Sequence, residues 1–407
     1  MRLLVLSGDG IGPEIVDSSL SVLSAANERF RLGLSFDHDD VGFTSLEKYG
    51  TTLRDEVLEK AKRYAGIILG TQSHADYPPP EKGGRNISAA FRTGLDLYAN
   101  IRPARTRPFL QSNLREGRTM DLVIMREATE GFYPDRNMSR GWGEVMPTQD
   151  MALSTRKITR QCCERIARRA FELASVRRNK VTAVHKVNSF HMTDGLFMNC
   201  VRSVSQDFPD VQLDDLLVDA CTAHLVRNPE RFDVLVTTNF YGDILSDLAS
   251  ELSGSLGLAG SIMASEKYCC AQAQHGSAPD IAGQDKANPV SMILSVAMLL
   301  EWMGNRHQHS GCVSASNAIT AAVDAVLEVP ELRTGDIGGT LGCKSFGEHV
   351  AKRITQTEHE YKTVDLSLCQ MKKGPRGPFF NSSQDHFVSQ DSTVAAPCFV
   401  FHSLSVL

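Results

Sequence analysis

The run RFDVLVTTNFYGDILSDLAS, residues 231–250, passes from a β-rich stretch straight into a predicted helix. Asp243 and Asp247 lie four residues apart, so this helix places both carboxylates on one face. Two like charges at this spacing repel each other by a few tenths of a kcal/mol. Either water solvates the two side chains or a cation lies between them.

Strand-like and helix-like segments alternate on both sides of this run. Buried strands are predicted at 2–7, 65–71, 121–127, 180–188 and 232–239. Helical patterns occupy 12–30, 154–176, 288–304, 315–329 and 347–354. This alternation predicts an α/β fold with a largely parallel sheet. Residues 357–407 are rich in Gly, Pro, Ser and Gln and are expected to form a loose tail.

The composition is that of a globular chain with material for two domains. It has 407 residues, of which 42% are hydrophobic and 22% charged, and a net charge of −5. Without a basic block, no nucleic-acid partner is expected. No apolar run approaches the ~20 residues of a membrane span, and Arg2–Ser7 is too short for the core of a signal peptide. We therefore expect no membrane partner and a cytoplasmic location.

The ten cysteines are typical of reduced thiols. Two adjacent pairs, Cys162–Cys163 and Cys269–Cys270, accompany scattered single residues without any CxxC spacing. In a long chain this pattern favours small core residues over a disulfide framework or a zinc site.

The glycine-rich start GDGIGPE, residues 8–14, has the spacing GxGxG. A classical dinucleotide-binding turn has GxGxxG, and even that match is weak by itself. The pattern favours a tight strand-to-helix turn that needs glycine dihedral angles.

Several charged residues lie at or near the ends of predicted strands, where the active sites of α/β proteins are found. Arg92, Arg102 and Arg126 are each explained singly as surface ion-pair residues, but together they suit a di-acid, because guanidinium groups match carboxylates bidentately. Lys186 ends a predicted strand, where burial without a purpose is costly, and suits a proton carrier. Tyr133 by itself is explained as a packing residue.

Acidic residues complete this set. Asp219 lies in the apolar stretch LLVDACTAHLV, where an unpaired carboxylate is costly, so an ion or a lysine partner is expected. With Asp243 and Asp247 it forms an all-oxygen set suited to Mg²⁺ or Mn²⁺. In the turn-rich loop 275–289, Asp280 is placed to accept from a ribose hydroxyl, as acidic residues do in NAD sites.

These segments, taken in order, resemble the β-decarboxylating dehydrogenases, and most closely 3-isopropylmalate dehydrogenases. The segments that carry the resemblance are GDGIGPEI, DLYANIRPAR, REATEGFY, VHKVN, VDACTAHLV, TTNFYGDILSDLAS, GSLGLAGS, HGSAPDIAG and ANPVSMILSVAMLLE. The likeness runs from Met1 to about Ile354.

The resemblance implies two α/β domains that share one long mixed sheet, with a non-Rossmann NAD site. One domain would comprise 1–100 and 254–356. The other, 101–253, would supply the interface of a homodimer with shared active sites, and Lys186 and Asp219 would enter the partner's site.

The resemblance also implies roles for individual residues in a 2-hydroxy di-acid dehydrogenase. Arg92, Arg102 and Arg126 would hold the malate carboxylates. Asp243, Asp247 and the partner's Asp219 would hold Mg²⁺ or Mn²⁺. Lys186 would deprotonate the hydroxyl through water or Asp219, and Tyr133 would protonate the enol. The cofactor-binding residues would be His275, Gly276, Ser277, Ala278, Pro279, Asp280, Ile281 and Asn288.

Three departures from the isopropylmalate pattern bear on the substrate. Ser88 stands where a leucine touches the isopropyl group, His185 where an Asp precedes the lysine, and Gln272 where a Glu precedes the HG loop. A polar pocket leaves tartrate, homoisocitrate and isocitrate as alternative substrates. A non-catalytic regulatory subunit is a further alternative, which the complete set of catalytic residue types disfavours.

Overall fold

The structure is a computed structural model that describes residues 1–368, with side chains to residue 356. Its main sheet has ten strands: β1 (Arg2–Leu6), β2 (Ser35–His38), β3 (Gly66–Leu69), β4 (Ala99–Arg105), β5 (Asp121–Glu127), β8 (Lys180–His185), β9 (Gln212–Leu217), β10 (Val234–Thr237), β11 (Ile262–Ala264) and β12 (Cys269–Gln272). A separate hairpin consists of β6 (Glu144–Thr148) and β7 (Met151–Ser154).

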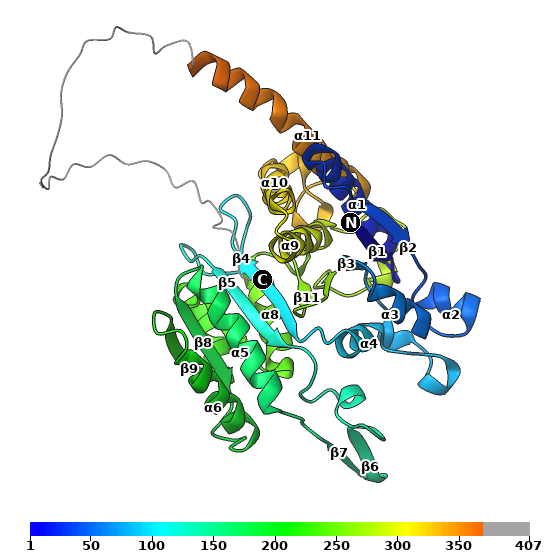
Figure 1. Ribbon diagram of the computed structural model, residues 1–407, viewed down its shortest axis with the longest axis vertical. Helices are drawn as coiled ribbons and strands as arrows, with labels where there is room; N and C mark the ends of the chain where they lie inside the picture. Colours follow the sequence, from blue (N-terminus) through cyan, green and yellow to red (C-terminus); the bar gives the residue numbers. More distant parts are fainter. Residues whose placement is uncertain (369–407) are drawn as a thin grey trace, which may run out of the picture.

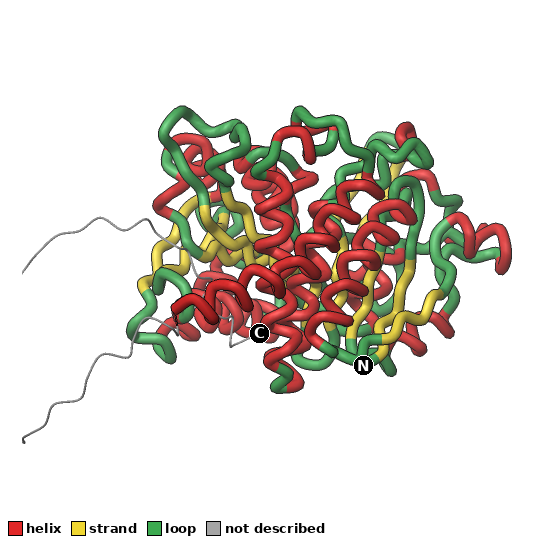
Figure 2. The backbone as a smooth tube through the Cα atoms, turned by 90° about the horizontal axis from the view of Figure 1, so that it is seen from above, coloured by secondary structure: helices red, strands yellow, loops and turns green. Residues whose placement is uncertain are grey.

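Helices pack along these strands (Figure 1), and Figure 2 shows the same arrangement from above. The α-helices are α1 (Gly12–Phe30), α2 (Phe43–Tyr49), α3 (Asp55–Ala61), α4 (Ile87–Gly94), α5 (Arg160–Ser175), α6 (Thr193–Ser205), α7 (Val218–Arg227), α8 (Asn239–Ser253), α9 (Val290–His307), α10 (Ser310–Leu327) and α11 (Cys343–Leu368).

The strand order is β2-β1-β3-β12-β11-β4-β5-β10-β8-β9. Both ends are parallel, whereas β11 pairs antiparallel with β12 and β4, and β4 pairs antiparallel with β5. Two parallel halves are thus joined through antiparallel strands, which confirms the α/β class and the single long mixed sheet. The domain boundaries at 100/101 and 253/254 stay a prediction.

Several boundaries differ from the sequence expectation, two of them by six residues or more. The helix expected at 154–176 begins only at Arg160, because β7 ends at Ser154 and the Thr159 hydroxyl accepts from the Cys162 backbone N–H as an N-cap (3.4 Å). The last helix continues to Leu368, so the loose tail does not begin at 357; residues 369–407 lie outside the described residues. The eight cysteines within the described part are free thiols, and all but Cys162 are buried.

α10 is the one helix in residues 1–368 that is long and apolar enough to span a membrane by length and composition. Of its 18 residues, Ser310–Leu327, 44% are buried, and the helix packs against α9, α1 and α11. This packing is that of a core helix in a globular α/β fold.

The glycine-rich start forms the turn between β1 and α1, as predicted. Gly8 and Gly10 have φ of 74° and 59°, values that favour glycine. A Cβ on Gly10 would lie 2.0 Å from the Ser277 carbonyl oxygen, and that oxygen accepts from the Ile11 N–H (2.8 Å). Glycine therefore lets the loop after β12 rest directly on this turn.

A pair of glycine substitutions tests this close approach. Gly33→Ala meets no atom within 4 Å at φ 65°, so it should lose about 1–2 kcal/mol of unfolding free energy through backbone strain alone. Gly10→Ala adds a clash with the Ser277 carbonyl and should lose at least about 2 kcal/mol more. Urea unfolding measures both, and equal losses would contradict the contact.

Candidate active site

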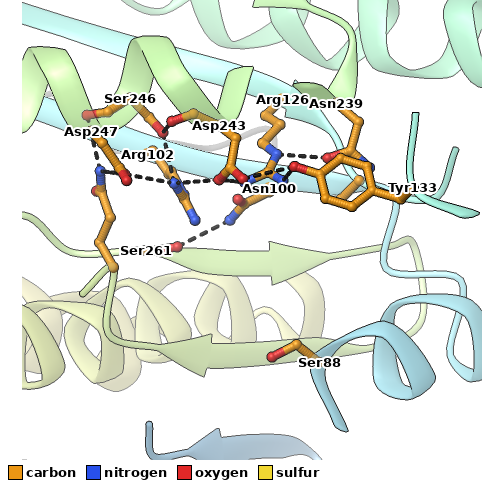
Figure 3. Close-up of polar contacts among 12 residues, drawn as sticks. Ser88, Asn100, Arg102, Arg126, Tyr133, Asn239, Asp243, Ser246, Asp247 and Ser261 are labelled. Atoms are coloured by element: carbon orange, nitrogen blue, oxygen red, sulfur yellow. Dashed lines mark hydrogen bonds and ion pairs between the residues drawn. The ribbon is translucent and has the colours of Figure 1, made fainter. Parts of the chain in front are cut away.

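Helix α8 carries the two carboxylates of the opening run at the carboxyl end of β10. Asp243 and Asp247 project from one face of this helix toward β4 and β5 (Figure 3). Their side chains are 40% and 51% exposed. The structure therefore brings the two together as the spacing predicted, with room for a further ligand on the open side.

Two arginines reach these carboxylates from the sheet. Arg126 pairs with Asn100 across β5 and β4, so Arg126 and Arg102 project from the same face. Arg102 Nη1 lies 3.4 Å from Asp243 Oδ1 and 3.2 Å from Asp247 Oδ1. Arg126 forms an ion pair with Asp243 and donates from Nε to Asn239 Oδ1 (2.8 Å). Burial alone would raise the pKa of Asp243, but Arg126 and Arg102 hold it below its usual value.

Arg92, the third arginine, lies on α4 and is only 9% exposed. Its Nε contacts Met263 Sδ (3.0 Å), and no carboxylate within the described residues pairs with it. Burial and the positive charges of Arg126, Arg136 and Arg102 lower its pKa to about 9. A buried guanidinium without a counter-ion is costly, so this position is built to receive an anion.

Tyr133 lies between these charges. Its hydroxyl donates to Asp243 Oδ2 (2.7 Å) and accepts from Arg126 Nη2 (2.9 Å). Burial raises its pKa, and Asp243 adds to that effect while Arg126 opposes it. Tyr133 therefore keeps its proton at neutral pH and points it into the cluster.

Lys186 and Asp219 form a second group. Lys186 Nζ lies 2.8 Å from Asp219 Oδ1, and this hydrogen bond lowers the pKa of Asp219. The lysine partner expected from the sequence is thus present. The apolar surroundings are not: Asp219 is 64% exposed, because α7 turns Cys221 and Leu225 inward instead. Within the described part of one chain, Asp219 does not cluster with Asp243 and Asp247.

The loop 275–281 follows β12 and ends in the turn η6 (Pro279–Ile281). Ser277 is buried and accepts at Oγ from the Ser73 hydroxyl (2.7 Å), whereas Asp280 is exposed. His275 Nε2 is buried without a partner among the described residues. Asn288 bonds Asp336 Oδ2 (2.9 Å) and accepts from the Val290 N–H (3.0 Å), so its side chain holds the start of α9.

Ser88 lies one turn before Arg92 on α4 and therefore shares its face. Its hydroxyl donates to Gln72 Oε1 (2.7 Å) and accepts from Gln272 Nε2 (3.1 Å). Gln272 Nε2 also donates to Gln72 Oε1 (2.9 Å). This part of the cleft wall is polar and uncharged.

Four further residues at this site were not predicted from the sequence. Asn239 and Ser246 bond Arg126 and Arg102, Gln274 bonds Asp247, and the charge of Arg136 acts on Arg92. Only Asn239 carried a usable signal, because it opens the helix directly after a buried strand.

A cavity of about 410 Å³ lies elsewhere, lined by strands β4 and β5 and by helices α5, α9 and α10. Its lining includes Ile101, Pro103 and Arg105 of β4, which alternate with the site-facing Arg102. It is therefore on the opposite face of the strand and separate from the arginine cluster.

Comparisons with known proteins agree with this geometry. A model of the isocitrate/isopropylmalate dehydrogenase family matches residues 2–350. An isocitrate/homoisocitrate dehydrogenase of Thermus thermophilus is 39% identical over 87% of this chain and 98% of its own length. A 3-isopropylmalate dehydrogenase of Archaeoglobus fulgidus is 37% identical over 87% and 99%.

Solved structures give the same answer. An isocitrate dehydrogenase from Methylococcus capsulatus superposes with a TM-score of 0.77 at 36% identity, over 87% of this chain and 99% of that one. This chain belongs to the isocitrate/isopropylmalate dehydrogenase family, and it is an oxidoreductase.

Proposed function

We propose that this protein catalyses the NAD-dependent and divalent-metal-dependent oxidative decarboxylation of a 3-substituted malate. The observation that carries the proposal is the buried Arg92, without a carboxylate partner, beside Arg102, Arg126 and Asp243. This surplus of positive charge fits a di-acid substrate, because guanidinium groups bind carboxylates through paired hydrogen bonds.

The donor set fits Mg²⁺ or Mn²⁺. Asp243 and Asp247 offer carboxylate oxygens from one helix face, and Asp219 is exposed enough to serve a neighbouring subunit. Such a cation, when bound, polarises the substrate oxygen at C2 and stabilises the charge that develops as CO₂ leaves.

The side chains of this chain supply the proton transfers. The Lys186–Asp219 pair would accept the proton of the C2 hydroxyl, directly or through water, and NAD, when bound, would supply the acceptor for the hydride from C2. After CO₂ leaves from C3, Tyr133 returns a proton to that carbon. Its raised pKa keeps it protonated until then.

The loop 275–281 is the proposed adenosine site. Its backbone rests on the glycine turn before α1, and His275 Nε2 offers a buried, unpartnered nitrogen. The exposed carboxylate of Asp280 suits a ribose hydroxyl and would repel a 2′-phosphate, which supports NAD rather than NADP.

A homodimer is proposed from the distribution of exposed apolar side chains. Of the 13 large hydrophobic residues exposed in the described part, 11 lie within 101–253: Met138, Trp142, Val145, Met146, Met151, Leu153, Phe190, Met192, Val226, Phe240 and Ile244. Such a concentration marks an interaction surface. Assembly through it would bring Lys186 and Asp219 to the partner's site. The proposed location is the cytoplasm.

A substrate of the tartrate, homoisocitrate or isocitrate type is the second candidate. The hydrogen-bonded cluster of Ser88, Gln72 and Gln272 favours it, because an alkyl substituent would bury these polar atoms without compensation. A non-catalytic regulatory subunit is disfavoured, since Tyr133, Lys186 and the three acidic residues are all present in the sequence.

A substrate panel tests the proposed reaction. Purified protein with NAD and Mn²⁺ should produce NADH and CO₂ with at least one member of a panel of 3-isopropylmalate, isocitrate, homoisocitrate and tartrate. Chelation with EDTA should stop the reaction, and added Mn²⁺ should restore it. Failure of every member with NAD and with NADP would contradict the proposal.

Asp243→Asn should reduce kcat by more than about 100-fold. Loss of a residue that only supports a metal ligand already costs about 10–100-fold in metal affinity or activity, and Asp243 is itself a proposed ligand. The fold should persist, since an amide of equal size replaces a partly exposed carboxylate. NADH formation and circular dichroism measure the two effects. The matched control is Asp207→Asn, which changes an exposed carboxylate two residues after the end of α6. Equal activity of the two variants would argue against the metal role.

Asp280→Lys should weaken NAD binding, because it removes the proposed ribose acceptor and adds a positive charge. Isothermal titration with NAD gives the dissociation constant. Glu331→Lys, an equal charge reversal at an exposed site outside the loop, should leave it unchanged. An unaltered constant for Asp280→Lys would remove this residue from the site.

A further inference from the structure

Gln274 connects the loop that precedes the proposed cofactor site to helix α8. It lies two residues after β12 ends and directly before His275. It is only 8% exposed. Its backbone N–H donates to Ser291 Oγ on α9 (3.1 Å), so the main chain is fixed while the side chain crosses to α8.

The side-chain amide has an unambiguous orientation. Its Nε2 lies 3.2 Å from Asp247 Oδ1, 3.0 Å from the Ser246 carbonyl oxygen and 2.9 Å from Ser250 Oγ. The carboxylate and the carbonyl are acceptors only, so a flipped amide would turn its own oxygen toward both. The donor side of Gln274 must therefore face α8.

Both donors that reach Asp247 bind the same oxygen. Arg102 Nη1 (3.2 Å) and Gln274 Nε2 (3.2 Å) converge on Oδ1. Within the described residues, Oδ2 makes no hydrogen bond or ion pair with the protein. This division restrains the rotation of the carboxylate and leaves Oδ2 available to a further ligand.

We propose that Gln274 is a positioning residue that orients Asp247 for a divalent cation, an inference that rests on the proposed metal role of Asp247. The arrangement has a cost, because Gln274 Oε1 is buried without a partner among the described residues. A neutral donor orients the carboxylate without cancelling its charge, whereas a second arginine would compete with the cation.

Mn²⁺ binding to the full-length protein, without NAD or substrate, tests this role. Electron paramagnetic resonance of free Mn²⁺ gives the dissociation constant. Gln274→Met, close in size but without hydrogen bonds, should weaken Mn²⁺ binding roughly 10-fold or more, as the loss of groups behind metal ligands does. Gln274→Asn, whose side chain is too short to reach Asp247, should weaken Mn²⁺ binding to a similar extent. This variant provides the test if the Met variant does not fold.

Two controls separate the possible outcomes. Ser250→Ala removes a Gln274 contact that does not involve Asp247, and its Mn²⁺ affinity should equal that of the unmodified protein. If Gln274 has a purely structural role, both Gln274 variants should lose unfolding free energy while their Mn²⁺ affinity stays unchanged. That result would overturn the role of Gln274 and leave the proposed metal site intact. If the unmodified protein binds no Mn²⁺, or Asp247→Ala binds it equally well, the proposed metal site falls and this inference falls with it.

Discussion

Uncompensated positive charge at the centre of the sheet is the constraint on which the site depends. Arg92, Arg102 and Arg126 are all buried, and Asp243 and Asp247 are the carboxylates that partly balance them. Burying guanidinium groups without equal negative charge is costly, and burial together with the neighbouring positive charges lowers the pKa of Arg92. In the proposed function, an anionic substrate would offset this imbalance.

The mixed topology of the sheet makes this arrangement possible. Antiparallel pairing of β4 with β5 sets Arg102 and Arg126 on one face, and α8 begins at the end of β10 on that face. Arg92 comes from the other half of the sheet, on α4. Because Arg92 and the other two arginines belong to different halves, a change in the angle between the halves would move Arg92 relative to Arg102 and Arg126, while the contacts of those two with Asp243 would persist.

Family membership and specificity rest on different residues. In the proposed reaction, the arginine cluster, Tyr133 and the α8 carboxylates would bind the groups that malate-type acids share. The hydrogen-bonded group of Ser88, Gln72 and Gln272 would meet the substituent that differs between such acids. Gln274 belongs to neither group, since its role is to hold Asp247. Substitutions in the wall should therefore alter substrate choice without altering the chemistry.

The sequence by itself determined the α/β class and the pairing of Asp243 with Asp247, because strand alternation and helical spacing are local properties of the chain. The family followed from the resemblance of its segments to known members. It misjudged Asp219 as enclosed by apolar neighbours and started the helix at 154–176 too early, since a helix face and an N-cap depend on what packs nearby. Only the tertiary structure decided that Arg92 lacks a counter-ion and that Gln274 reaches α8. Those contacts join residues about 30 to 170 positions apart, and no local pattern encodes which distant side chains meet.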